Sequence, residues 1–192
     1  MSRMEFGIVH RPKSGRNISG DAYLIKEAEE ATLVCLVDGL GSGEAAAEAA
    51  QAAIRCVQVN STLPLSDIMA KCHQALKGTR GAVVALMRIS FAESTLTFVG
   101  VGNISIHARS TALIKPISRN GIVGYRLPRL REFTYPYTPG DLFVLHTDGI
   151  SNRFTLDSAV WMKEAQDVQI LADEIARNFG KKNDDVTILI AR

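Results

Sequence analysis

The core of the predicted fold is the stretch Thr32-Leu33-Val34-Cys35-Leu36-Val37-Asp38-Gly39-Leu40-Gly41. Its first part, residues 32–37, is an uninterrupted run of β-branched and apolar side chains, which is typical of a buried strand. Asp38 follows directly, so a carboxylate stands at the end of a rigid element. The stretch therefore predicts the middle of a sheet with an acidic group at its edge.

Acidic groups stand beside other candidate strands as well. Residues 142–145 lead towards Asp148, and residues 186–190 directly follow Asp184-Asp185. Gly20-Asp21 is a further acidic motif near the N-terminus. An Asp-Gly pair on its own is more often a tight turn than a ligand. Together, carboxylates fixed by rigid strands are what Mg²⁺ and Mn²⁺ select, so the sequence predicts a divalent metal site.

The composition limits the class of protein. The 192 residues are 46% hydrophobic and 22% charged, so we expect one domain over residues 1–192. The formal charge of +2 is dispersed along the chain, so no nucleic-acid partner is expected. The N-terminus has no signal-peptide pattern and no segment approaches the length of a membrane span, so no membrane partner is expected. We also expect a monomer.

The cysteines indicate the redox compartment. Cys35, Cys56 and Cys72 are odd in number and lack the spacing of a zinc site. They therefore predict reduced structural thiols and a cytoplasmic location.

The helical patterns fall into three segments. We predict helices over residues 44–57, from Pro64 to Gly78, and over residues 170–179, with Ser42 and Asp167 as N-caps. The first two are expected to cover one face of a sheet. Trp161 is interpreted as a packing anchor.

The strand patterns are mostly contiguous. Strands are predicted over residues 6–10, 22–26, 82–90, 95–101 and 104–108. Residues 82–101 read as a hairpin that residues 104–108 continue as a meander. Residues 118–139 are rich in Gly and Pro and predict loop with a short edge strand. Helices grouped apart from strands favour an α+β fold over a doubly wound parallel fold.

Several of these motifs resemble those of PP2C-type, metal-dependent serine/threonine phosphatases, and in particular the compact SpoIIE-like branch. The motifs occur in the same order and span nearly the whole chain. They are Ser19-Gly20-Asp21, residues 37–43, Arg80-Gly81-Ala82, residues 100–103, Pro139-Gly140-Asp141, residues 146–150 and Asp184-Asp185-Val186-Thr187.

The resemblance implies a fold and a metal centre. The fold is an α-β-β-α sandwich of two antiparallel sheets flanked by helices, and the centre holds two Mn²⁺ or Mg²⁺ ions. Asp38 would bridge the ions, the Gly39 carbonyl would bind one of them, and Asp21 would bind directly or through water. Asp148 and Asp184 would complete the site around the other ion.

Further roles follow from the same resemblance. Asp185 takes a supporting role. Arg16 stands five residues before Asp21, where many relatives carry a phosphate-contacting arginine. We therefore assign Asp38, Asp21 and Arg16 to catalysis. Asn103 replaces an aspartate of larger relatives, which favours two ions over three.

This chemistry needs no protein nucleophile. Two metal ions can lower the pKa of a bridging water to about 7 and neutralise charge on the phosphoryl oxygens. The function expected is hydrolysis of phosphoserine or phosphothreonine in a protein. The resemblance implies phosphorylated STAS-domain proteins of a stressosome, in general stress signalling, as partners. No organic cofactor is expected.

Two alternatives remain open on the sequence. The chain could be a non-catalytic module that binds phosphoproteins, although retained metal ligands argue against it. It could also hydrolyse a small phosphomonoester, because specificity depends on residues 118–139. The arginines of that loop could contact an acidic partner or simply be solvated. They are Arg119, Arg126, Arg129 and Arg131. His146 is interpreted as a hydrogen-bonded core residue rather than a general acid.

Overall fold

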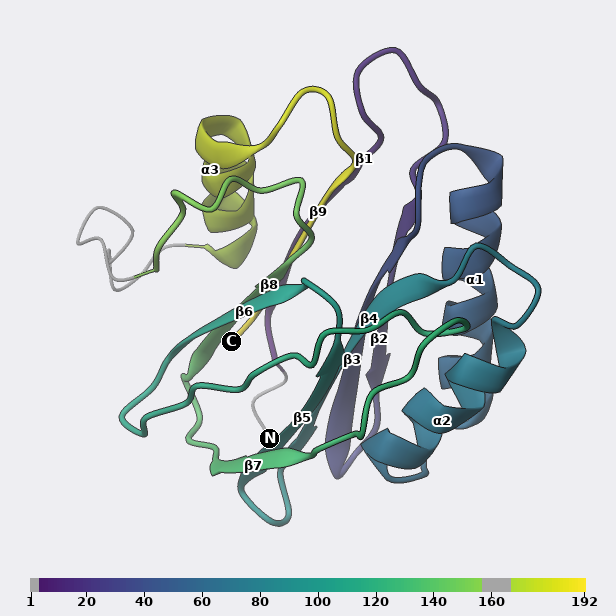
Figure 1. Cartoon of the computed structure of the whole chain (residues 1–192). Coiled ribbons are helices and arrows are strands. Elements are labelled where there is room, and N and C mark those ends of the chain that lie inside the picture. Colours follow the sequence, from purple (N-terminus) through teal and green to yellow (C-terminus); the bar gives the residue numbers. More distant parts are fainter. Residues whose placement is uncertain (1–3, 157–166) are drawn as a thin grey trace.

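The computed structural model describes residues 4–156 and 167–192, so the predicted anchor Trp161 lies outside the described residues. The described chain forms two antiparallel sheets packed face to face (Figure 1). A five-stranded sheet has the order β2-β3-β4-β5-β7. Its strands are β2 (Asp21–Glu27), β3 (Ala31–Gly39), β4 (Ala82–Ser90), β5 (Thr95–Val101) and β7 (Phe133–Pro136).

The second sheet is four-stranded and has the order β1-β9-β8-β6. Its strands are β1 (Phe6–Arg11), β6 (Ser105–Arg109), β8 (Leu142–His146) and β9 (Val186–Ala191). Strands from the two ends of the chain therefore meet, because β1 pairs with β9.

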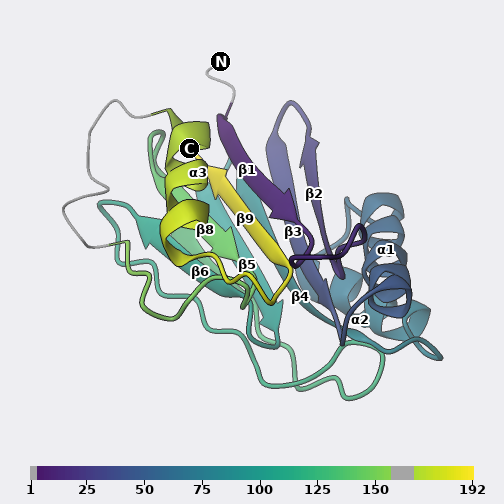
Figure 2. The same cartoon turned by 90° about the horizontal axis from the view of Figure 1, so that it is seen from above.

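Helices cover the outer face of each sheet. Helices α1 (Glu44–Val59) and α2 (Leu65–Ala75) lie on the five-stranded sheet, and α3 (Val168–Phe179) lies on the four-stranded sheet. The view along the layers shows the order helix, sheet, sheet, helix (Figure 2). The predicted α-β-β-α sandwich, and the placement of the first two helices on one face, are confirmed.

Strand β3 shows why the opening apolar run is continuous. Val34 and Leu36 pack between the two sheets, whereas Cys35 and Val37 pack under helices α1 and α2. All four side chains are fully buried. A strand covered on both faces needs apolar residues at every position rather than at alternate ones.

One strand was predicted correctly but in the wrong sheet. Residues 105–109 form β6, which pairs with β8 in the four-stranded sheet instead of continuing the β4–β5 meander. The chain crosses between the sheets after Gly102, whose φ of +105° belongs to the left-handed region. Alternating side chains identify a strand but do not identify its partner.

Helix boundaries also differ from the prediction. Ser42 is not the N-cap of α1, because Gly43 holds that position and no side chain caps the helix. Helix α2 ends at Ala75 rather than at Gly78, which lies in the following turn with φ of +85°. Asp167 does cap α3, as predicted, by accepting hydrogen bonds from the amides of Gln169 and Ile170.

Two sequence predictions about compartment can be compared with the structure. Cys35, Cys56 and Cys72 are all free thiols, and burial raises the pKa of Cys35 and Cys72. In the described part of the chain, none of the helices has the length and apolar character needed to cross a bilayer.

Candidate metal centre

The predicted acidic residues gather at one end of the sandwich. Asp38 lies at the end of β3, Asp148 just after β8, and Asp184 just before β9. All three line one open cleft of about 400 Å³. Because β3 belongs to one sheet and β8 and β9 to the other, the cleft is assembled from both sheets.

The other walls of the cleft come from loops. The Gly-rich turn after β3 and the loop before β7 both contribute to its lining. The remaining lining residues are Leu40, Gly41, Val83, Gly102, Asn103, Asn120, Gly121 and Ile122. The loop predicted to carry specificity therefore forms part of the cleft wall.

Asp38 is held among like charges. It is directly opposite Asp21 in the antiparallel β2–β3 pair. Burial raises the pKa of Asp38 to about 8, and the charges of Asp21, Asp148, Asp184 and Asp185 add to this shift. A bound cation would relieve both effects, because it compensates the charge that burial and repulsion disfavour.

Asp21 lies behind the cleft rather than on its lining. Its side chain is 4% exposed, and its Oδ2 accepts hydrogen bonds of 2.8 Å from the hydroxyls of Thr147 and Thr187. Burial raises the pKa of Asp21 to about 7, although the two hydroxyls act in the opposite direction. The strand register places this carboxylate beside Asp38, where a direct or water-mediated role in a metal site is feasible.

Asp148 and Asp184 are each contacted by one neighbouring side chain. Asn103 Nδ2 donates a 3.0 Å hydrogen bond to Asp148 Oδ2, so the residue that replaces a family aspartate orients a predicted ligand. Lys181 Nζ lies 3.9 Å from Asp184 Oδ2. Burial, followed by the charge of Asp148, raises the pKa of Asp184.

Asp185 does not line the cleft, and its carboxylate accepts hydrogen bonds from two backbone amides. Its Oδ1 accepts from the amide of Lys13 at 2.8 Å, and its Oδ2 accepts from the amide of Gly20 at 2.7 Å. These bonds tie the segment before Asp21 to the start of β9. They give Asp185 a structural contact of the kind expected for a supporting residue.

Close backbone packing explains two glycines of the acidic motifs. A Cβ at Gly39 would collide with the carbonyl oxygen of Ala46, in the first turn of α1. A Cβ at Gly149 would collide with the carbonyl oxygen of Asp185. Side chains at these positions would separate the elements that carry the acids, so glycine is required for packing.

Arg16 is not brought to the cleft. It lies exposed in the loop between β1 and β2 and is not among the residues that line the cleft. Arg80, to which the sequence analysis gave no role, is not a lining residue either, but its guanidinium lies against the lining residue Gly41. A Cβ built on the cleft residue Gly41 would be 2.5 Å from Arg80 Nη1. Only the tertiary fold reveals this proximity, because helices α1 and α2 separate the two residues in sequence.

The histidines include a pair that sequence spacing did not reveal. His146 is buried, as predicted, and its Nδ1 donates to the carbonyl of Thr147 at 2.9 Å. The Nε2 atom of His107 lies 3.1 Å from His146 Nε2. Burial lowers the pKa of His146 to about 4, so the ring is neutral near pH 7. The unprotonated Nε2 of neutral His146 then accepts a hydrogen bond from the Nε2–H of His107.

The residues present fit a hard divalent cation held in an open site. Among residues 4–156 and 167–192, no group of three Asp, Glu, His or Cys side chains is arranged to hold a metal ion by itself. Mg²⁺ commonly keeps several waters and takes only one or two protein carboxylates. A cleft with Asp38, Asp148 and Asp184 spaced around its walls matches that preference better than a closed cage does.

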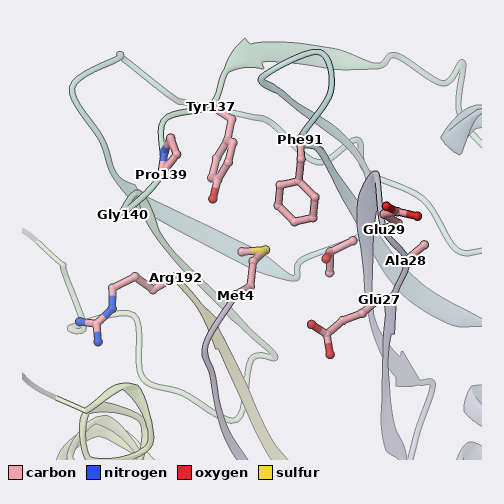
Figure 3. Close-up of a pocket in the computed structure, with 10 residues that line it drawn as sticks. Met4, Glu27, Ala28, Glu29, Phe91, Tyr137, Pro139, Gly140 and Arg192 are labelled. Carbon is pink, nitrogen blue, oxygen red and sulfur yellow. The ribbon is translucent and has the colours of Figure 1, made fainter. Parts of the chain in front are cut away.

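A larger cavity lies at the other end of the sandwich. It has a volume of about 800 Å³, and Met4, Phe91 and Tyr137 form an apolar floor (Figure 3). Its acids, Glu27 and Glu29, come from the exposed β2–β3 hairpin. Size alone would favour this cavity as a ligand site. We assign the chemistry to the smaller cleft, because acids from both sheets meet only there among the described residues.

The sandwich and its strand-end carboxylates define the class of PP2C-type, metal-dependent serine/threonine phosphatases. A family model described as stage II sporulation protein E (SpoIIE) matches residues 28–192, and the chain belongs to this family. It is 29% identical over 183 residues to the phosphoserine phosphatase RsbX of Bacillus subtilis, covering 94% of this chain and 90% of RsbX.

Solved structures agree with the family assignment. A structure described in work on the bacterial stressosome as a modular system superposes with a TM-score of 0.94 and 34% identity, covering 100% of both chains. The crystal structure of RsbX with magnesium gives a TM-score of 0.87 and 25% identity, covering 98% of this chain and 94% of RsbX. The predicted family, fold class and enzyme class are confirmed.

Proposed function

We propose that this protein uses two Mn²⁺ or Mg²⁺ ions to hydrolyse phosphoserine or phosphothreonine in a partner protein. The observation that carries the proposal is the convergence of Asp38, Asp148 and Asp184 on one cleft, with Asp21 paired to Asp38 across the strands. In this proposal Asp38 would hold both ions. The Gly39 carbonyl and Asp21 would help to hold one of them, and Asp148 and Asp184 would help to hold the other.

The chain's own residues supply binding and orientation. When bound, the two cations supply an activated water and neutralise charge on the phosphoryl group. Strand-end placement fixes the carboxylates before substrate arrives, so little reorganisation is needed. Asn103 and the threonines 147 and 187 orient Asp148 and Asp21 from behind.

The identity of the substrate is supported by the relatives. RsbX is described as a phosphoserine phosphatase and its structure contains magnesium, and a further relative comes from work on the stressosome. On this basis we propose phosphorylated STAS-domain stressosome proteins as substrates. The free cysteines are consistent with action in the cytoplasm.

A phosphate-release assay tests the proposal. The purified chain is incubated with phosphoserine and phosphothreonine peptides, with a phosphorylated STAS-domain protein, and with a small chromogenic phosphate, in Mn²⁺ or in chelator. We expect Mn²⁺-dependent release that is faster from the protein than from the small ester. Binding of the phosphoprotein without release would identify a non-catalytic module instead. Equal preference for the small ester would identify a small-molecule phosphatase.

A further inference from the structure

We propose that Arg80 contacts the phosphoryl group of the substrate at the rim of the cleft. This assignment rests on the proposed phosphatase function and names the residue that recognises its substrate. Arg80, rather than Arg16, then takes the phosphate-contacting role that the sequence pattern predicted.

The position of the guanidinium carries the assignment. Arg80 Nη1 would lie 2.5 Å from a Cβ built on Gly41, and Cζ and Cδ would lie 3.6 and 3.8 Å from it. The whole end of the side chain therefore lies across Gly41, which lines the cleft. Gly41 is three residues from Asp38, so their Cα atoms are at most about 10–11 Å apart.

The backbone that carries Arg80 is pinned to the site. The carbonyl of Gly81 accepts a 3.0 Å hydrogen bond from the amide of Leu40, another lining residue. The hydroxyl of Thr79 accepts from the amide of Gly81 at 3.0 Å and donates to the carbonyl of Leu76 at 2.7 Å. Arg80 thus projects from a tight turn that is fixed on both sides. Binding of a ligand then has to order only the side chain, and not the backbone that carries it.

The guanidinium is available for an anion. Within the described residues, Arg80 makes no salt bridge or side-chain hydrogen bond, and its side chain is exposed. The cleft beside it is lined by three carboxylates and no basic side chain. A planar fork of N–H donors matches two phosphoryl oxygens, which is a geometry that the strand-end carboxylates cannot provide.

Gly41 keeps this place open. Its φ of +96° lies in the left-handed region, and a side chain there would occupy the space of the Arg80 guanidinium. Among residues 4–156 and 167–192, Arg16 makes no comparable side-chain contact, and its backbone amide donates to the carbonyl of Lys13 at 3.1 Å.

Kinetics of matched arginine variants test the assignment. Arg80→Ala and Arg80→Lys are compared with Arg55→Ala, which removes an exposed arginine from α1 away from the cleft. With Mn²⁺ and a phosphoserine peptide, we expect Arg80→Ala to raise KM about 10- to 100-fold, the range for a lost hydrogen bond to a charged group. kcat should change much less, because binding to the phosphoryl group is lost equally in the ground and transition states.

Product inhibition and metal binding separate recognition from a structural role. The inhibition constant of inorganic phosphate should rise by the same factor as KM in Arg80→Ala, and Arg80→Lys should recover part of both. Calorimetry with Mn²⁺ alone should give the same affinity in Arg80→Ala as in the unchanged protein. Loss of Mn²⁺ affinity would show instead that Arg80 only shapes the metal site and would overturn the assignment.

Two further outcomes would also overturn it. The first is that Arg80→Ala has the same KM, and the same inhibition constant for inorganic phosphate, as Arg55→Ala. The other is a larger rise in KM for Arg16→Ala, run in parallel. If the unchanged protein released no phosphate at all, the proposed function would fail. Calorimetric binding of inorganic phosphate to the Mn²⁺-loaded variants would then still decide whether Arg80 binds the anion.

Discussion

Asp38 combines burial, like charge and a strand-end position in one side chain. Its pKa is raised to about 8 by burial first and then by four neighbouring carboxylates. Such an arrangement destabilises the metal-free protein whenever Asp38 is ionised. The same arrangement supplies the negative charge that a divalent cation needs. Function and stability therefore oppose each other at this residue.

Replacing Asp38 separates these two effects. Asp38→Asn should lower metal-dependent kcat by more than about 100-fold, since even indirect partners of metal ligands cost about 10- to 100-fold. In chelator at pH 8 it should raise the free energy of unfolding by on the order of 1 kcal/mol, because a buried charge is removed. Phosphate release and thermal unfolding measure the two effects. Retained turnover would exclude the bridging role, and a lowered melting temperature would contradict the charge argument.

Metal affinity should depend on pH because protons compete for the same carboxylates. The pKa of Asp21 is raised to about 7 and that of Asp38 to about 8, so both bind protons in the metal-free protein near neutral pH. Apparent Mn²⁺ affinity should fall about tenfold per pH unit for each proton displaced as pH drops from about 8 to 6. Calorimetry in two buffers of different ionisation enthalpy counts the protons. A pH-independent affinity without proton release would contradict the shifts.

The same shifts fix the sign for stability in chelator. Each of the two carboxylates has a folded-state pKa above its ordinary value of 3.8. Their contribution to the free energy of unfolding is therefore fully present below pH 3.8. It is lost as pH rises through about 7 for Asp21 and about 8 for Asp38.

At the scale of elements, the carboxylate of Asp21 links the two sheets. Asp21 begins β2 in the five-stranded sheet, whereas its partners Thr147 and Thr187 belong to the ends of β8 and β9 in the other sheet. Two short hydrogen bonds thus cross the sandwich at the end where the cleft lies. They hold the two halves of the proposed metal centre in register.

Removing one of these bonds should affect both stability and the metal. Thr187→Val should lower the free energy of unfolding by about 1–3 kcal/mol, because Asp21 and His10 each lose a hydroxyl partner. It should also weaken Mn²⁺ binding by about 10- to 100-fold. Thr134→Val, on the exposed edge strand β7, is the matched control and should change neither. Unchanged Mn²⁺ affinity in Thr187→Val would show that Asp21 does not act on the metal.

Elements were predicted well where their signal is local. The run over residues 32–37 marks a strand because both faces of β3 are buried, and Asp167 marks a helix start because its side chain bonds the next amides. The partner of residues 104–108 depends on a crossing between sheets, which alternation does not encode. Ser42 has a capping side chain, but Gly43 takes the cap position.

Sequence motifs predicted the acidic residues of the site but not the long-range contacts that support them. The sequence identifies three of the acids, Asp38, Asp148 and Asp184, because each follows or precedes an apolar strand. The contacts of Asp21 join residues 126 and 166 positions apart, and no pattern predicts such a pair. Arg16 has the family spacing to Asp21, whereas Arg80 has the position beside the cleft. Sequence spacing therefore favours Arg16 as the phosphate-contacting arginine, whereas spatial proximity favours Arg80.

For the whole molecule, the metal should act as a stabilising ligand. Cations that bind the folded cleft and not the unfolded chain stabilise by about 2.7 kcal/mol at 100 times Kd. For a chain of this size that corresponds to a rise in melting temperature of roughly 5–10 °C. Thermal unfolding in a Mn²⁺ series measures the shift. An equal shift in Asp38→Asn would place the bound Mn²⁺ elsewhere.

The molecule should stay folded when the metal is removed. Three separate apolar cores fill the spaces between α1, α2 and the first sheet, between the sheets, and between the second sheet and α3. The cleft lies at one end of these layers rather than within them. Chelation is therefore expected to stop the chemistry without unfolding the protein.

The pairing of β1 with β9 has a consequence for the order of events during synthesis. Among the described strands β1 is made first, yet it pairs only with β9, which is made last. Asp184, just before that last strand, also lines the cleft. A nascent chain therefore carries β1 unpaired and the proposed metal centre incomplete until residues 184–191 have left the ribosome.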